Sequence, residues 1–252
     1  MDSLAASTVS QFTRSPLTWA SVAFLGMLGF QAASAFSAAA PPAPVARPPA
    51  RVASAAASTG QAATRLPYYG SADFTAEWIT PGTPKYAGLH RIAPFSLRNQ
   101  QGQVISEQSL RGKIYVANFF FSSCPSVCPK MLANLRRIQD AFASDPGVLL
   151  VSHSVMPGVD SVEVLAEYAE KNGIRPGKWH LLTGPKDTLY DLARNSYFAE
   201  KKAPAKKDPR EFLHSEHLLL IDGSGHIRGI YNATLPLDAE RVIGDIRELQ
   251  QE

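Results

Sequence analysis

The chain has 252 residues, of which 45% are hydrophobic and 19% are charged, so its length and composition allow one sizeable core. The formal net charge of +3 does not indicate a nucleic-acid partner, because a phosphate-binding surface needs basic residues concentrated on one face. The one basic concentration, at 201–210, is broken by two alanines and a proline and is interpreted as a solvated loop.

An apolar segment near the N-terminus predicts export. Residues 17–30 carry no charge, follow Arg14, and precede an A-x-A-like sequence at 33–35, as in a signal peptide. The apolar stretch continues to Phe36, so at about 1.5 Å per residue it would nearly cross a hydrocarbon layer of about 30 Å. We expect residues 1–36 to be a signal peptide or an uncleaved anchor. The folded part is then expected in the periplasm or another extracytoplasmic space, and an uncleaved segment would hold it at the inner membrane.

A change of composition marks the start of the folded domain. Residues 37–65 consist largely of Ala, Pro, Ser and Thr, and bury too little surface to offset the entropy lost on ordering. They are predicted to be a flexible linker. Aromatic residues return at 66–79, so the domain is expected to span residues 66–252.

Regular patterns begin after Ile92. Short strands around 95–97 and 104–105, separated by a polar turn, predict a hairpin. Ser106 is expected to cap a short helix that ends by Gly112. The run at 113–121 is almost entirely apolar and rich in aromatic and β-branched residues, which is typical of a strand buried on both faces.

The remaining chain alternates between helical and strand patterns. Apolar residues recur with helical spacing after the cysteines, from Met131 to Phe142. Strands are predicted at 148–155, 179–182, 217–222 and 227–231, and helices at 162–171, 185–198 and 238–249. This order predicts an α/β fold, with a central mixed sheet flanked by helices and a hairpin extension at the N-terminal side. It contains the order of the thioredoxin-like fold.

Two cysteines, Cys124 and Cys128, lie just after the strand at 113–121, where the next helix is expected to begin. A helix N-terminus favours thiolates, and Pro129 is compatible with a first helical turn. The spacing is one residue longer than C-x-x-C, and on a helical turn both sulfurs are expected to project to one side. Two thiolates so placed suit a soft ion such as Cu(I) or Zn(II). Redox exchange and an inert or disulfide-bonded pair are the alternatives.

A third ligand is predicted in the sequence EFLHSEHLLLID. His214 lies just before the strand at 217–222, which in a thioredoxin-like sheet neighbours the strand that ends at the cysteines. Disulfide reductases of this fold have a proline shortly before this strand, and none stands at 215–217 here, which favours metal binding over dithiol exchange. The predicted metal ligands are therefore Cys124, Cys128 and His214.

The other five histidines are weaker ligand candidates. Each has its own expected environment: His217 faces away from the site, His153 is either buried or near the site, His180 makes ordinary hydrogen bonds, and His90 and His226 are exposed.

With these residues, the chain resembles the Sco/SenC family of copper proteins that assist cytochrome c oxidase assembly. The resemblance covers about residues 66–250 and rests on FFFSSCPSVCP, for the C-P-x-x-C-P motif, and on LHSEHLLLID, for the histidine motif. The segment LLVSHSVMPGVDSVEVLAEYAEKNG is also similar. The resemblance implies a thioredoxin-like domain in an exported or membrane-tethered protein, and copper bound by Cys124, Cys128 and His214.

Two positions depart from the family pattern. Ser126 stands where the family often has an acid, and Met156-Pro157 stands where it usually has Asp-Pro. These changes are expected to make the site less negative, which would weaken Cu(II) retention or alter partner docking and leave the soft Cu(I) ligands intact. Met156 is expected to be a core residue rather than a thioether ligand.

The resemblance implies a metallochaperone that carries Cu(I), or also Cu(II), to the dinuclear copper site of a cytochrome c oxidase subunit. Another copper chaperone or a thiol reductant would be further partners. The alternative is a thiol–disulfide oxidoreductase that keeps the oxidase's copper-site cysteines reduced and does not need His214. Peroxiredoxin-type peroxidase chemistry is disfavoured, because Phe121 occupies the position where that chemistry uses threonine.

Overall fold

The structure is a computed structural model that describes residues 66–199 and 216–252. The predicted leader and linker (1–36 and 37–65) and His214 lie outside the described residues. No helix in the described ranges combines the length and the apolar character needed to span a bilayer.

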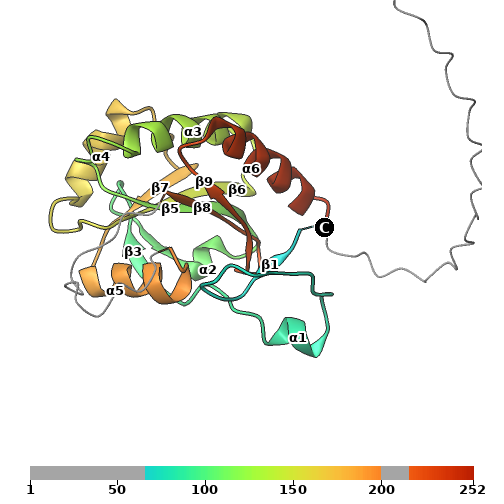
Figure 1. Cartoon of the computed structure of the whole chain (residues 1–252). Coiled ribbons are helices and arrows are strands. Elements are labelled where there is room, and N and C mark those ends of the chain that lie inside the picture. Colours follow the sequence, from blue (N-terminus) through green and yellow to red (C-terminus); the bar gives the residue numbers. More distant parts are fainter. Residues whose placement is uncertain (1–65, 200–215) are drawn as a thin grey trace, which may run out of the picture. The chain divides into compact units, whose positions relative to one another are not determined.

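A seven-stranded mixed sheet, in the order β2-β1-β9-β8-β5-β6-β7, forms the centre of the domain, and β3 and β4 form a separate hairpin (Figure 1). The strands are β1 Tyr68–Tyr69, β2 Ala76–Glu77, β3 Ser96–Arg98, β4 Val104–Ser106, β5 Ile114–Phe120, β6 Val148–Ser154, β7 Trp179–Leu182, β8 His217–Ile221 and β9 Ile227–Asn232. The helices are α1 Pro84–Ala87, α2 Glu107–Leu110, α3 Cys128–Ala141, α4 Val162–Lys171, α5 Lys186–Asp191, the π-helix η1 Leu192–Ser196 and α6 Pro236–Leu249. The predicted α/β class, mixed sheet and hairpin are confirmed.

Strand direction determines which loops meet at each end of the sheet. β5 pairs with β6 in parallel, whereas β8 pairs with β5 antiparallel, with Ala117 opposite Leu219. The C-terminal ends of β5 and β6 therefore lie beside the N-terminal end of β8. We call this end of the sheet the cysteine end, because the loop after β5 carries Cys124 and Cys128.

Both faces of the sheet are covered, as the apolar run of β5 predicted. Val116 and Phe120 belong to a core cluster shared with α3, α4 and α6. The alternate residues Ala117 and Phe119 belong to a second cluster on the other face, with residues of α5 and the β3–β4 hairpin. Figure 1 shows α3, α4 and α6 on one side of the sheet and α2 and α5 on the other. A strand buried between two layers can be apolar along its whole length.

The predicted helix at 185–198 is wrong in one respect, because it is not one continuous α-helix. α5 ends at Asp191, and the chain continues as the wider π-helix to Ser196. The N–H of Tyr197 then donates to the carbonyl of Leu192 at 2.8 Å, five residues earlier. By contrast, α4 and β7 have the predicted bounds, and Ser161 caps α4 by accepting from the N–H of Val164.

The segment that enters the domain forms two strands that the sequence did not predict. β1 pairs with β9 through Tyr69 and Ile227, and β2 pairs with β1. Each strand has only two residues, which is too short for an alternating pattern to be visible. The sheet is therefore wider than expected at this edge.

A buried arginine holds the entering segment against the sheet. The guanidinium of Arg228, on β9, donates to the carbonyls of Leu66 and Pro67 at 2.9 and 3.1 Å. It also pairs with the carboxylates of Asp222 and Glu252. Its donors are thus satisfied by two carbonyls and two carboxylates, which is the condition for burying a cation at acceptable cost.

Candidate metal centre

The two cysteines occupy different positions relative to α3. Cys128 is the first residue of the helix, whereas Cys124 lies in the preceding turn, with its N–H donating to the carbonyl of Phe121 at 3.3 Å. The expectation that both cysteines belong to the first helical turn is therefore wrong for Cys124. The two thiols still come together, because they hydrogen-bond to each other. No disulfide joins Cys124 and Cys128.

The environment of Cys124 favours its thiolate. Partial burial would raise the pKa of this thiol, but hydrogen bonds from the Cys128 thiol and from the backbone N–H groups of Ser126, Cys128 and Val127 outweigh the burial. The pKa of Cys124 therefore lies below the ordinary thiol value. The turn and the helix N-terminus supply these N–H groups, which have no intrahelical partners.

Cys128 has the opposite environment. Burial, above all, and then its hydrogen bond to Cys124 raise the pKa of Cys128 to about 12. The side chain belongs to the core cluster that also contains Met131 and Phe120. Cys124 is thus a partly exposed residue that favours the thiolate form, and Cys128 is a buried residue that favours the protonated thiol.

This asymmetry predicts selective alkylation. At about pH 7.5, iodoacetamide should modify Cys124 roughly 100-fold faster than Cys128, because the thiolate is the reactive form and Cys124 is the more exposed. The rate at Cys124 should rise as the pH passes its lowered pKa, whereas Cys128 should stay unreactive until far higher pH. Fragment-ion mass spectrometry of the shared peptide measures both rates. In urea the two rates should become similar, and similar rates in the folded protein would contradict the asymmetry.

A buried carboxylate, Asp160, fixes the start of the cysteine loop. Its side chain is 0% exposed and accepts hydrogen bonds from the N–H (3.3 Å) and the hydroxyl of Ser122. Its other oxygen accepts from the Ser154 hydroxyl at 2.5 Å, and Ser154 in turn accepts from the N–H of Met156 at 3.1 Å. One carboxylate therefore joins the end of β5 to the end of β6, two residues before Cys124.

Asp160 also changes the expectation about charge at the site. Ser126 and Met156 led us to expect a less negative centre, but the carboxylate of Asp160 is close enough to raise the pKa of Cys128, after burial and the Cys124 bond. The sequence analysis did not identify Asp160. The signal that could have identified it is an acidic residue between the end of a strand and Ser161, which caps the next helix.

The expectation of a core Met156 is wrong, because its side chain is 40% exposed in the loop after β6.

His214 is outside the described residues, which resume at Glu216. The predicted neighbourhood of β8 and β5 is confirmed, and His217 begins β8 at the cysteine end. The His217 ring packs edge-on against Phe74, at 5.5 Å between centroids. Phe74 belongs to the cluster on the face opposite Cys128, so His217 points away from the cysteines as predicted. Across residues 66–199 and 216–252, no three His, Cys, Asp or Glu side chains are grouped to hold a metal ion.

His153, His226 and His90 have structural roles. His153 is fully buried, which lowers its pKa to about 3, and its ring stacks on Phe119. The expectation of exposure is wrong for His226, which is 1% exposed beside the Tyr86 ring. It is also wrong for His90, which is half-buried and hydrogen-bonded to the carbonyl of Ser196 at 2.7 Å. Tyr86, before β3, covers the His226 ring, whereas Ser196 and Phe198 cover the His90 ring, and nothing in the local sequence of either histidine indicated that cover.

Comparison with known proteins identifies one family. The family model described as SCO1/SenC matches residues 85–251. A similar protein is the SCO1 protein homolog of Bacillus subtilis (strain 168), which is 28% identical over 160 residues, 63% of this chain and 82% of that protein.

Three solved structures resemble the described part. BsSco, a member of the Sco family of cytochrome c oxidase assembly proteins in which a disulfide switch was identified, is 26% identical with a TM-score of 0.55, over 64% of this chain and 93% of that chain. A SCO1/SenC family lipoprotein from Bacillus anthracis str. Ames is 28% identical, with a TM-score of 0.56, over 64% and 95%. Arabidopsis thaliana ScoI with copper bound is 27% identical, with a TM-score of 0.51, over 64% and 98%. The fold is thioredoxin-like, as predicted.

Proposed function

Because this chain belongs to the SCO1/SenC family, we propose that it is a copper metallochaperone that delivers copper to the dinuclear copper site of cytochrome c oxidase during assembly. Its copper ligands are Cys124, Cys128 and His214. The observation that carries the proposal is the adjacent pair of thiols, Cys124 in the turn before α3 and Cys128 at its first residue. Backbone N–H groups favour the thiolate form of Cys124. Copper is the cargo, so the site must both bind it and release it.

The donor chemistry fits a soft, singly charged ion. Thiolate sulfur prefers Cu(I) to hard cations, and metal binding releases the proton of any thiol that becomes a ligand. Here that proton is on Cys128, whose raised pKa makes copper binding pH-dependent and stronger as the pH rises. The partly exposed sulfur of Cys124 gives an acceptor's thiolates a point of attack for ligand exchange.

The position of His217 supports the role of His214. His217 begins β8 at the cysteine end, and His214 precedes it by three residues. Three residues span at most about 11 Å even when fully extended, so the chain would keep His214 within about 11 Å of His217. His217 itself faces the other side of the sheet, which leaves His214 as the histidine candidate of this motif.

Relatives support the cargo and the compartment. Arabidopsis ScoI was solved with copper bound, BsSco belongs to a family of cytochrome c oxidase assembly proteins, and the Bacillus anthracis protein is a lipoprotein. These agree with an extracytoplasmic or membrane-associated carrier whose partner is the copper-site subunit of the oxidase. The apolar segment within residues 1–36 would supply export and, if uncleaved, the attachment.

A second candidate function is thiol–disulfide exchange that keeps the oxidase's copper-site cysteines reduced. The unequal pKa values of the two cysteines favour it. The Cys124 thiolate would attack a partner disulfide and release one partner thiolate; Cys128 would then lose its proton and displace the other, leaving a Cys124–Cys128 disulfide and a reduced partner. A thiol reductant would have to restore the pair. This route does not use His214.

Substitution of His214 distinguishes the two functions. In an anaerobic titration of the reduced full chain against a Cu(I) chelator, the wild type should hold one copper tightly, and His214→Ala should weaken binding by about 100-fold, because a ligand is lost. The rate of dithiol exchange with glutathione disulfide should be largely retained. His217→Ala is the matched control and should keep wild-type copper affinity. No tight copper in the wild type, or equal binding in all three proteins, would leave dithiol exchange as the better account.

A further inference from the structure

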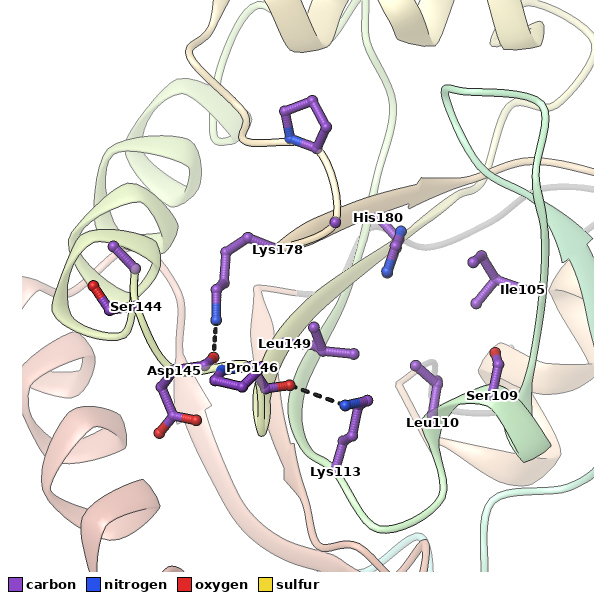
Figure 2. A pocket seen from close by; sticks show the side chains of 13 residues that line it. Ile105, Ser109, Leu110, Lys113, Ser144, Asp145, Pro146, Leu149, Lys178 and His180 are labelled. Carbon is purple, nitrogen blue, oxygen red and sulfur yellow. Dashed lines mark hydrogen bonds between the residues drawn. The ribbon is translucent and has the colours of Figure 1, made fainter.

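A cavity lies at the end of the sheet opposite the cysteines, where β5, β6 and β7 begin. It is an open cavity of about 490 Å³ between α2, the loop after α3 and the segment before β7. Figure 2 shows Lys113, Lys178 and His180 around it, with Leu110 and Leu149 on its apolar wall. The copper proposal uses none of these residues.

Hydrogen bonds determine which ring nitrogen of His180 carries the proton. The amide oxygen of Asn99 accepts from the N–H groups of Gln101 and Gln103, both at 2.9 Å, so the orientation of the amide is determined. Its NH₂ group therefore donates to Nδ1 of His180 at 3.2 Å. A neutral imidazole that accepts at Nδ1 carries its proton on Nε2. Burial lowers the pKa of His180, so the ring is neutral near pH 7 and offers one N–H donor within the cavity wall.

Two ammonium groups lie in the same cavity. Lys113 donates to the carbonyl of Pro146 at 3.0 Å, and Lys178 donates to the carbonyls of Val148 at 2.7 Å and Asp145. An ammonium has three N–H donors, so these bonds leave two on Lys113 and one on Lys178. Lys178 is only 6% exposed, and burial lowers its pKa against the attraction of Asp145, with repulsion from Lys113 adding to the effect. An anion between the two ammoniums would relieve that repulsion.

The carboxylate of Asp145 binds Gly147 and Gln250 rather than the two lysines. One oxygen of Asp145 accepts from the N–H of Gly147 at 2.7 Å, and the other accepts from the side-chain amide of Gln250 at 2.6 Å. In Figure 2 the carboxylate points away from Lys178 and His180. Among the residues lining the cavity, the positive charge is therefore only partly compensated.

We propose that this cavity binds a small organic anion, whose acidic group contacts Lys113, Lys178 and Nε2 of His180 and whose apolar part lies against Leu110 and Leu149. The volume is within the range of small-molecule sites, about 300 to 1,000 Å³, and is larger than an inorganic anion needs. Charge-assisted bonds fix the acidic group, and apolar contact selects a ligand with a short hydrocarbon body. Short-chain monocarboxylates have this chemistry.

The test is a titration of the full chain with hexanoate, followed by amide shifts in ¹H–¹⁵N NMR spectra. We expect saturable shifts centred on Ser109, Lys178 and His180. Lys113→Gln should weaken hexanoate binding by about tenfold, the effect of losing one charge-assisted hydrogen bond. Lys130→Gln, an exposed lysine in the first turn of α3 at the cysteine end, is the matched control and should leave the affinity unchanged. Lys178 is not substituted, because it also holds two backbone carbonyls.

Two further probes test the chemical class. Hexanamide, which has the same hydrocarbon chain without the charge, and inorganic phosphate, which has charge without a chain, should both bind at least about tenfold more weakly than hexanoate. The proposal is overturned by the absence of saturable shifts, by shifts centred on other residues, by equal affinity in Lys113→Gln and Lys130→Gln, or by equal binding of either probe.

Discussion

Replacing Cys128 by serine is expected to lower the affinity of the reduced protein for Cu(I) by about 1,000-fold or more. Loss of an outer hydrogen-bond partner of a ligand typically costs about 10- to 100-fold in metal affinity, and loss of a thiolate ligand itself should cost more. The serine hydroxyl is hard, stays protonated at neutral pH and does not bind a soft ion well. It can still donate a hydrogen bond to Cys124, so the loop should keep its conformation. Anaerobic competition with a Cu(I) chelator measures the change.

Variants in the same loop make this result specific. Cys124→Ser should cause a loss of similar size, because each sulfur is expected to be a ligand. Ser123→Ala, an exposed substitution next to Cys124, should leave copper affinity unchanged. Far-UV circular dichroism of each variant checks that the domain is folded. Wild-type copper affinity in either single-cysteine variant would show that copper is held elsewhere, and the proposed site would be wrong.

Replacing Asp160 by alanine is expected to lower the free energy of unfolding of the metal-free, reduced protein by about 3 kcal/mol. The substitution leaves the Ser122 N–H and the hydroxyls of Ser122 and Ser154 without their acceptor, and of these groups Ser154 is fully buried. An unsatisfied buried donor costs about 1 to 3 kcal/mol, and the two hydroxyls recover part of this by rotating. Urea denaturation, followed by tryptophan fluorescence, measures the loss.

Two controls separate the role of Asp160 from a general effect of removing charge. Asp160→Asn keeps one oxygen acceptor and should cost less than Asp160→Ala. Asp187→Ala removes an exposed carboxylate from the first turn of α5 and should cost below about 1 kcal/mol. The pKa of Cys128 should also fall in Asp160→Asn, because the carboxylate contributes to raising it. Equal costs for Asp160→Ala and Asp187→Ala would contradict the proposed anchoring.

The sequence predicted those elements of the fold whose residue pattern extends over a whole strand or helix. The continuous apolar run of β5 indicated a strand covered on both faces, and the helical pattern at 162–171 gave the bounds of α4. It failed for β1 and β2, because two-residue strands are set by their pairing partners and by Arg228 rather than by their own sequence. Such tertiary determinants leave no local pattern to read.

For the candidate site, the sequence indicated the elements but not their connections. The positions of Cys124 and Cys128 after β5, and the neighbourhood of β5 and β8, were predictable from strand order. The bridge made by Asp160 was not predictable, because its partners belong to two other strand ends that meet only in the folded sheet. The burial of His226 was missed for the same reason, since its cover comes from residues far away in the sequence.

The buried Arg228 determines where the chain enters the domain relative to the proposed copper site. It fastens the first described residues to β9 beside Ile227, at the end of the sheet where β5 begins. β5 has seven residues, so at about 3.3 Å per residue some 20 Å of sheet separates this point of attachment from the cysteines. Under the proposed membrane attachment, the domain would be held at the end of the sheet opposite the sulfurs. The oxidase subunit proposed as acceptor would then contact the cysteine end, about the length of β5 away from the point where the chain enters the domain.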